Sequence, residues 1–404
     1  MQISTVIAVA GVAGSGKSTL GRAIATQLSS PLIDLDHVSN PLLDALPVEA
    51  LGGEHWISSP FAPQIREGRY AALRAVVADA VSTTQSAVVV APFTAELTGG
   101  HEWDLLREAV APARLIVVNM VGDPQLLAAR RHQRGAERDS HRTDVGASLP
   151  AIDVVCVDAE LATEQQVSRV LAAAGVRLPI DEAAPLFTAD FDAVLFDLDG
   201  TLVDSTASVI RSWRRFAEHY GVSMQALHAN HGQPARTLVG KLLPRELHDE
   251  ALAYVTRLEV TDAAGLAPVQ GALSFFESVP ATQRAIVTSG SVPIAHARLA
   301  AAGFAHPDVF VTVDDVTRGK PDPEPFLLAA QRLGVAPERC LVVEDANAGI
   351  TAARAAGCHV LAIAGTVDAE ELDAEVVVDG LDRVEIVRSG DALRLRPSGA
   401  SGRT

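Results

Sequence analysis

The stretch AVLFDLDGT, residues 193–201, places two carboxylates, Asp197 and Asp199, directly after a short apolar run. Such a run predicts a buried strand of a parallel sheet. Side chains alternate along an extended chain, so carboxylates two residues apart lie on the same side. They also follow the carboxyl end of the strand, where open α/β sheets place their sites. One carboxylate could attack phosphorus while the other protonates the leaving alcohol and then activates water.

Further parts of such a site come later in the chain, each after its own apolar run. Lys320 follows the run 309–311 and offers an ammonium that could neutralise both the nucleophile and phosphoryl oxygens. Glu344 and Asp345 follow the run 340–343 and offer hard oxygen ligands for Mg²⁺. The run 284–287 is followed by a hydroxyl and by backbone N–H groups, those of Thr288, Ser289 and Gly290. The sequence therefore predicts one site at one edge of a sheet.

The motifs DLDGT, VTSG, RGKPDPEPF and VVEDANAGI together resemble the haloacid dehalogenase superfamily of phosphatases, in the branch with a helical cap. The resemblance covers residues 191 to about 380 and is closest to sugar and polyol phosphate phosphatases. It implies that Asp197 is the nucleophile and a Mg²⁺ ligand, and that Asp199 is the acid–base group, with its main-chain carbonyl on Mg²⁺. It also implies roles for four other residues: Thr288 and Lys320 on the phosphoryl group, Asp345 on Mg²⁺, and Glu344 supporting the metal site.

An insertion is expected between the first and second apolar runs of this half. About 80 residues separate 193–196 from 284–287, and their pattern is helical over 208–219, 223–229, 234–243 and 246–259. We therefore predict a helical cap, 205–280, on a core formed by 191–204 and 281–395. By resemblance, the cap supplies substrate contacts from Gly232, Arg236 and Glu259, and Ser289 and Gly290 contact the phosphate.

The first half of the chain contains a second motif. The stretch GVAGSGKS, residues 11–18, matches G-x-x-x-x-G-K-[ST] and lies between an apolar run, 6–10, and a helical pattern, 19–28. Backbone N–H groups of such a loop close on phosphates, Lys17 reaches the terminal phosphates, and the Ser18 hydroxyl can hold Mg²⁺. The residues expected to bind ATP here are Gly11, Gly14, Ser15, Gly16, Lys17, Ser18 and Thr19.

Residues 1–175 resemble small-molecule P-loop kinases of the gluconate and shikimate kinase type. Asp34 and Asp36 end the next apolar run, and the resemblance implies that one of them contacts a small hydroxyl acceptor. It also implies that Arg130 or Arg134, which share a helix face, closes over ATP as part of a lid. These residues also fit a helix cap and a solvated helix face. The third apolar run, 88–92, ends without the acidic residue that many P-loop proteins carry.

Length and composition limit the partners, the compartment and the fold that the chain can have. The 404 residues carry a net charge of −17, which disfavours a nucleic-acid partner. No apolar run is long enough to cross a bilayer, and three cysteines without a CxxC pair fit a reducing compartment, so we expect a cytoplasmic protein with no membrane partner. The expected fold is α/β: two Rossmann-like, three-layer domains with parallel sheets. The expected limits are 1–178 for the first domain, 179–190 for a linker and 396–404 for a disordered tail.

Three other functions remain open at this stage. A polynucleotide kinase-phosphatase also fuses a P-loop kinase to a phosphatase of this superfamily, although the negative charge, the few aromatic residues and the cap speak against it. A relative of β-phosphoglucomutase would transfer phosphate within a sugar. The first half could also act as a nucleotide sensor without kinase activity. The sequence leaves the oligomeric state undetermined.

Overall fold

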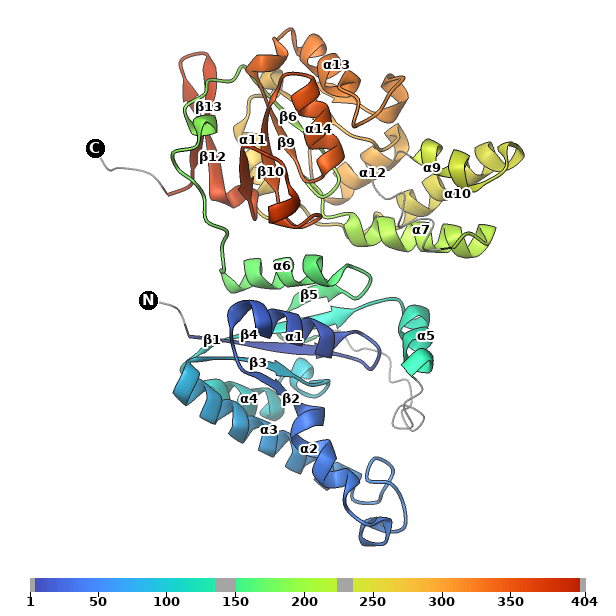
Figure 1. Ribbon diagram of the computed structural model, residues 1–404, viewed down its shortest axis with the longest axis vertical. Coiled ribbons are helices and arrows are strands. Elements are labelled where there is room, and N and C mark those ends of the chain that lie inside the picture. The colour runs from blue at the N-terminus through green and yellow to red at the C-terminus, as the bar shows by residue number, and fades with distance from the viewer. Residues whose placement is uncertain (1–3, 135–149, 224–234, 400–404) are drawn as a thin grey trace. The chain divides into compact units, whose positions relative to one another are not determined.

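A computed structural model describes residues 4–134, 150–223 and 235–399 (Figure 1). The chain divides into two compact units, Met1–Val176 and Arg177–Thr404. Each unit is built on a parallel sheet with helices on both faces, because the strands are apolar on both sides. The predicted α/β class with parallel sheets is confirmed.

The N-terminal unit has a five-stranded sheet in the order β2-β3-β1-β4-β5. The strands are β1 (Thr5–Gly11), β2 (Leu32–Asp34), β3 (Ser86–Val90), β4 (Arg114–Val121) and β5 (Val155–Asp158). The helices are α1 (Lys17–Leu28), α2 (Leu35–Asp44), α3 (Ala62–Thr84), α4 (His101–Val110), α5 (Pro124–Arg134) and α6 (Thr163–Ala174). Alternate residues of β1 pack on opposite faces, Ile7 towards α1 and α6, and Ala8 towards α3 and α4.

The C-terminal unit has a six-stranded parallel sheet in the order β11-β10-β9-β6-β7-β8. Its strands are β6 (Ala193–Phe196), β7 (Arg284–Val287), β8 (Val309–Val311), β9 (Cys340–Glu344), β10 (His359–Ile363) and β11 (Val376–Val378). One face packs against α11 (Ala272–Ser278) and α12 (Val292–Ala301), and the other against α13 (Glu324–Leu333) and α14 (Asn347–Ala355). The two middle strands are β9 and β6, and β6 pairs with β9 on one side and β7 on the other.

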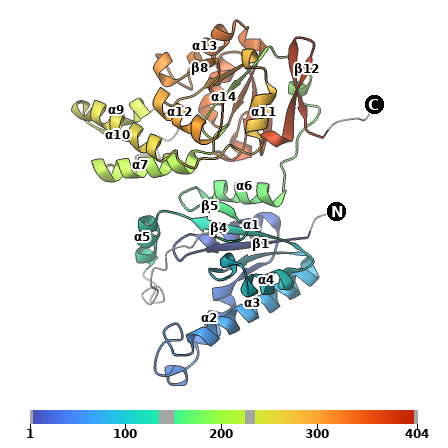
Figure 2. The same ribbon diagram turned by 180° about the vertical axis from the view of Figure 1, so that it is seen from behind.

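Among the described residues between β6 and β7, three helices form a separate layer, which we call the cap: α7 (Thr206–Tyr220), α9 (Ala235–Leu242) and α10 (His248–Thr261). Figures 1 and 2 both show them gathered to one side of the sheet. They have their own apolar core, centred on Phe216, Val239, Ala251 and Val255. Most of the helix expected at 223–229 lies outside the described residues, and so does Gly232.

The structure differs from the expected domain limits in three places. The linker 179–190 is packed into the C-terminal unit, because Leu186 and Phe187 bury their side chains in its core. The cap stops short of 280, because α11 packs on the sheet through Phe275 and Phe276. Residues 396 and 397, expected in the tail, belong instead to an antiparallel hairpin, β12 (Val384–Ser389) and β13 (Ala392–Pro397), which buries Leu393 and Leu395.

Within the described parts of the chain, no helix combines the length and apolar character needed to cross a membrane.

Candidate active site

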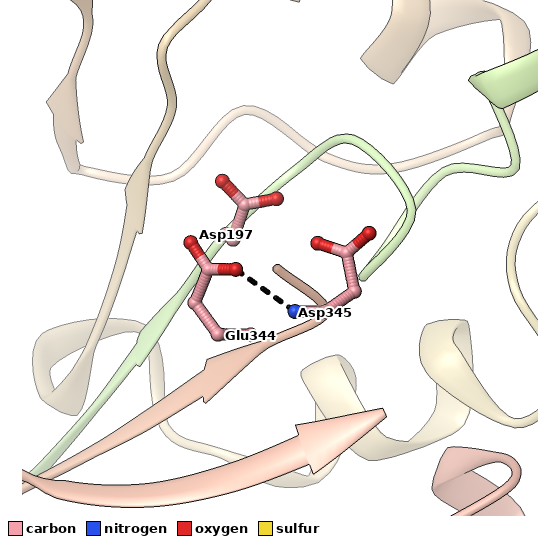
Figure 3. A group of neighbouring side chains, drawn as sticks. All are labelled: Asp197, Glu344 and Asp345. Carbon is pink, nitrogen blue, oxygen red and sulfur yellow. Dashed lines mark hydrogen bonds between the residues drawn. The ribbon is translucent and has the colours of Figure 1, made fainter. Parts of the chain in front are cut away.

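The central strands of the C-terminal sheet bring acidic residues from distant parts of the chain together. Asp197 follows β6, and its backbone N–H donates to the carbonyl of Val343 on β9 at 2.9 Å, which extends the pairing of β6 with β9 to this residue. Glu344 ends β9 and Asp345 follows it. Each of the three side chains offers a carboxylate oxygen within 4.8 Å of the others, and all three are buried (Figure 3). The predicted residues therefore meet at one sheet edge.

Lys320 supplies positive charge at this edge. Its Nζ donates to Asp197 Oδ1 at 2.5 Å, to Glu344 Oε1 at 2.7 Å and to the Val287 carbonyl at 2.9 Å. The ammonium thus donates its three hydrogen bonds to groups at the ends of β6, β7 and β9. The centre of the Phe326 ring lies 5.0 Å from Nζ. One lysine between two carboxylates fixes both side chains and offsets part of their charge.

The charges at this edge do not balance among the protein groups. Burial, together with the nearby Glu344 and Asp199, raises the pKa of Asp197 to about 8, although Lys320 opposes the shift. Burial and the neighbouring Glu344 and Asp197 also raise the pKa of Asp345 well above its ordinary value. Burial alone would lower the pKa of Lys320, but the two carboxylates it contacts outweigh burial and raise it. If all three carboxyls ionise, one ammonium leaves the site net negative, so a hard divalent cation suits it in place of the protons that burial retains.

Glu344 and Asp345 differ in the atoms they leave for a metal. Glu344 Oε1 accepts from Lys320, and its Oε2 accepts from the backbone N–H groups of Asp345 and Ala346 at 2.8 and 3.0 Å. Asp345 accepts from the Thr201 hydroxyl at 3.2 Å through Oδ1 and also hydrogen-bonds the Thr366 side chain, so its partners are neutral hydroxyls. Both oxygens of Glu344 are therefore engaged in shaping the loop, and Asp197 and Asp345 are the better placed metal ligands.

Gly200 lies where the loop after β6 approaches the loop after β9, and this approach leaves no space for a side chain. Its φ is +85°, and a Cβ atom there would lie 2.0 Å from Asp345 Oδ2. We expect Gly200→Ala to displace the Asp345 carboxylate and to lower the affinity of the site for Mg²⁺ by at least about tenfold. Isothermal titration with Mg²⁺ checks this. Gly221→Ala is the matched control, since that glycine also has a positive φ, +66°, but open space around its Cβ position. Equal Mg²⁺ affinity in the two variants would contradict the assignment.

The metal-free protein should lose stability as pH rises towards 8. Asp197 keeps a proton in the folded state up to about pH 8, whereas the unfolded chain releases it near the ordinary value of 3.8. The folded state therefore binds more protons than the unfolded state between about pH 4 and pH 8, and the free energy of unfolding falls across that window. A bound cation takes the proton's place, so Mg²⁺ should raise Tm more near pH 8 than near pH 4. Thermal unfolding with and without millimolar Mg²⁺ measures this, and equal shifts at both ends would contradict it.

Asp199 lies beside this cluster and has partners that the sequence did not indicate. Its Oδ1 accepts from the Ser205 hydroxyl at 2.6 Å, and its Oδ2 lies 2.6 Å from a guanidinium nitrogen of Arg298 on α12. Arg298 also pairs with Glu259 on cap helix α10 at 2.6 Å. Glu259, expected to contact substrate, is thus buried against an arginine. One indication of this role was present in the sequence: Arg298 is an arginine within the otherwise largely apolar segment 292–301.

The remaining predicted phosphatase residues take different positions. Thr288 is buried after β7, and its Oγ1 accepts from the Gly290 N–H at 2.9 Å. Ser289 and Gly290 lie in the same partly exposed loop. Arg236 is exposed at the start of α9, and its contact with substrate stays a prediction.

The glycine-rich loop of the N-terminal unit lies where the motif requires it. Gly11 ends β1, and residues 12–16 join it to α1, whose N-cap, Gly16, has a φ of +90°. The Ser18 hydroxyl donates to Asp34 Oδ2 at 2.9 Å, and Asp34 also caps α2 by accepting from the Asp36 N–H. The buried Ser15 hydroxyl has no hydrogen-bond partner within the described ranges. The loop residues and one of the two predicted acceptor carboxylates are therefore adjacent.

The arginines expected in a lid are less well placed. Arg130 donates to the carbonyl of Ala159 at 2.9 Å, which ties it to the loop before α6. Arg134 ends α5, and its side chain is outside the described part of the structure. Arg131, which the sequence did not single out, donates to the Ala13 carbonyl in the glycine-rich loop at 3.3 Å.

A cavity of about 260 Å³ in the N-terminal unit is lined in part by Leu35, the residue before Asp36. Its wall includes Trp56, Arg66, Arg69 and Tyr70. Arg69 donates to Asp36 at 2.8 Å and lies over the Trp56 ring. A cavity with an aromatic wall and cationic groups suits a small polar molecule.

Comparisons with known proteins concern the C-terminal unit. A family model described as haloacid dehalogenase-like hydrolase matches residues 191–357. Hexitol phosphatase A of Escherichia coli is 40% identical over 208 residues, which cover 49% of this chain and 96% of that protein. Validoxylamine A 7'-phosphate phosphatase of Streptomyces hygroscopicus subsp. limoneus is 34% identical, covering 48% and 96%. A fructose-1-phosphate phosphatase of Escherichia coli is 35% identical, covering 41% and 93%. Through this unit, the chain belongs to the haloacid dehalogenase-like hydrolases.

Proposed function

We propose that the C-terminal unit hydrolyses the phosphate monoester of a small sugar or polyol through an aspartyl phosphate on Asp197. The observation that carries the proposal is the convergence of Asp197, Lys320 and Asp345 at the carboxyl end of the sheet. The names of the relatives, which act on hexitol, validoxylamine and fructose phosphates, support the substrate class.

The chemistry divides into two steps. A carboxylate oxygen of Asp197 attacks phosphorus, the ester P–O bond breaks, and the leaving oxygen takes a proton from the Asp199 carboxyl. Water then attacks the phosphorus of the aspartyl phosphate and gives its proton to Asp199, which releases inorganic phosphate and restores Asp197. Lys320 offsets the negative charge that attack brings together, and the Thr288 hydroxyl and loop N–H groups receive phosphoryl oxygens.

A divalent cation fits the donor set. Asp197, Asp345 and the main-chain carbonyl of Asp199 would hold Mg²⁺, because all three offer oxygen donors and the two carboxylates supply negative charge when they ionise. When bound, Mg²⁺ supplies positive charge that allows the Asp197 carboxylate and a phosphate dianion to approach each other.

A phosphate-release screen tests the proposal. The panel contains sorbitol 6-phosphate, mannitol 1-phosphate, fructose 1-phosphate and glycerol 1-phosphate, with a 3′-phosphorylated oligonucleotide and β-glucose 1-phosphate as arms for the rival functions. Release from a small polyol ester and none from the oligonucleotide is the expected result. An isomerised sugar phosphate instead of free phosphate would favour a mutase, and no release from any panel member would overturn the proposal.

We further propose that the N-terminal unit binds ATP at residues 11–19 and transfers a phosphoryl group to a hydroxyl acceptor in the cavity lined in part by Leu35. The contact between Ser18 and Asp34 supports this, because it links the phosphate-binding loop to the carboxyl end of β2.

Lys17→Ala should weaken ATP binding by at least about tenfold, since Lys17 is the residue that reaches the terminal phosphates. Lys241→Ala, at an exposed cap position, is the matched control. If the unit binds ATP but forms no ADP with any polyol, it acts as a nucleotide sensor and not as a kinase. Absence of ATP binding would contradict both functions.

A further inference from the structure

Arg298 connects the acid–base residue of the core to the cap. It lies on α12, directly after the loop that contains Thr288, and its side chain is 3% exposed. Its Nη1 pairs with Asp199 Oδ2, and its Nη2 pairs with Glu259 Oε2, both at 2.6 Å. Because α12 belongs to the core and α10 to the cap, one buried guanidinium joins two parts of the fold that are otherwise built on separate apolar cores.

Both ends of this connection are well defined. Glu259 is 7% exposed, and Trp213 on cap helix α7 also hydrogen-bonds it. Asp199 has its other oxygen on Ser205, which is the N-cap residue of α7. Both partners of the Asp199 carboxyl therefore lead to the cap, one directly through α7 and one through Arg298 to α10.

The geometry of a guanidinium makes this arrangement directional. Its planar fork donates in fixed directions, so a carboxyl held on one arm has few orientations open to it. Arg298 and Glu259 are shielded from solvent, so ions in the medium screen their pair little, whereas the Asp199 side chain is 26% exposed. A carboxyl that must deliver a proton to one ester oxygen benefits from such a hold, since a small misplacement of a catalytic group slows the reaction strongly.

We propose that Arg298 is a positioning residue that orients Asp199 for proton transfer, and that Glu259 makes this orientation depend on cap helix α10. The inference rests on the proposed phosphatase function. Glu259 keeps the guanidinium neutralised and anchored on the cap side, so that Arg298 is not left as an unpaired buried charge when Asp199 turns to the ester or takes a proton from water. The proton donor is then correctly placed when the cap encloses the substrate.

The test compares two leaving groups. Sorbitol 6-phosphate releases an alkoxide, which needs the Asp199 proton, whereas p-nitrophenyl phosphate releases a stabilised phenolate, which does not. Because kcat/KM covers the steps up to departure of the leaving group, the ratio of kcat/KM for the two esters reports on the proton donor. Arg298→Met should lower the alkyl-to-aryl ratio by at least about tenfold, since general acid catalysis contributes about 10²- to 10⁴-fold.

Three further variants separate positioning from folding. Arg298→Met combined with Glu259→Gln removes the unpaired carboxylate, so the fold recovers but the ratio should stay low. Glu259→Gln alone should lower the ratio in the same direction, and Arg298→Lys should restore part of it. Arg339→Met is the matched control, because it removes a 2.6 Å ion pair with Asp192 at the opposite end of β6 and should leave the ratio unchanged.

The outcomes distinguish this inference from the function it rests on. Equal losses for both esters, or a double variant with the ratio of the native protein, would overturn the positioning role while the phosphatase stands. A native protein that releases phosphate from neither ester would instead refute the proposed function.

Discussion

Replacing Asp197 by Asn should reduce phosphate release by about 10⁴-fold or more, because removal of a nucleophile removes the covalent route altogether. The amide cannot form an acyl phosphate, and it also withdraws a charge from the metal site. The fold should survive, since Asn fills the same space and its amide oxygen can still accept from Lys320. Steady-state phosphate release from sorbitol 6-phosphate, together with thermal unfolding, measures the two effects separately.

Asp192→Asn is the matched control for this variant. Asp192 precedes β6, on the same segment as Asp197, and forms an ion pair with Arg339 away from the acidic cluster. It should retain activity close to that of the native protein. Turnover by Asp197→Asn within tenfold of the native rate would contradict the assignment of the nucleophile.

Lys320→Met should lower kcat/KM by about 10³-fold. The variant loses three hydrogen bonds and leaves Asp197 and Glu344 facing each other without the ammonium between them. Removal of a single charge-stabilising donor from a dry site typically costs about 10²- to 10³-fold, and this side chain also separates two carboxylates. Kinetics with p-nitrophenyl phosphate measure the loss, since that ester has no need of the Asp199 proton.

Lys320→Arg should give little rescue. The site holds a compact ammonium that points at three acceptors, and a planar guanidinium cannot donate in those directions within the same buried space. Lys241→Met, at an exposed cap position, serves as the control. Recovery of more than a tenth of the native activity by the arginine variant would show that charge alone suffices.

The acidic cluster was predictable from sequence because its information is local. Each predicted residue follows a short apolar run, and parallel strands bring their carboxyl ends to one edge. Hence Asp197, Lys320 and Asp345 could be placed together without knowledge of the strand order. The ends of β6 and β7 agree with the expected limits for the same reason, since the change from apolar to polar residues is abrupt there.

The partners of Asp199 could not be predicted in this way. Arg298 lies in an apolar helix far along the chain, and its contact with Glu259 depends on how the cap packs on the core. The hairpin β12–β13 was missed because its residues, rich in charge, carry the signature of a surface segment, although Leu393 and Leu395 are buried. The cavity lined in part by Leu35 was missed as well, because Trp56, Arg66 and Arg69 meet only through the packing of α3.

The most direct measurement is to trap the phosphoryl group on the protein. The native protein is mixed with ³²P-labelled sorbitol 6-phosphate and Mg²⁺, quenched in acid within one turnover and reduced with borohydride, which converts an aspartyl phosphate to homoserine. We expect acid-stable label that is lost on reduction, and homoserine at position 197. Absence of label during active turnover, or homoserine at any other position, would contradict it.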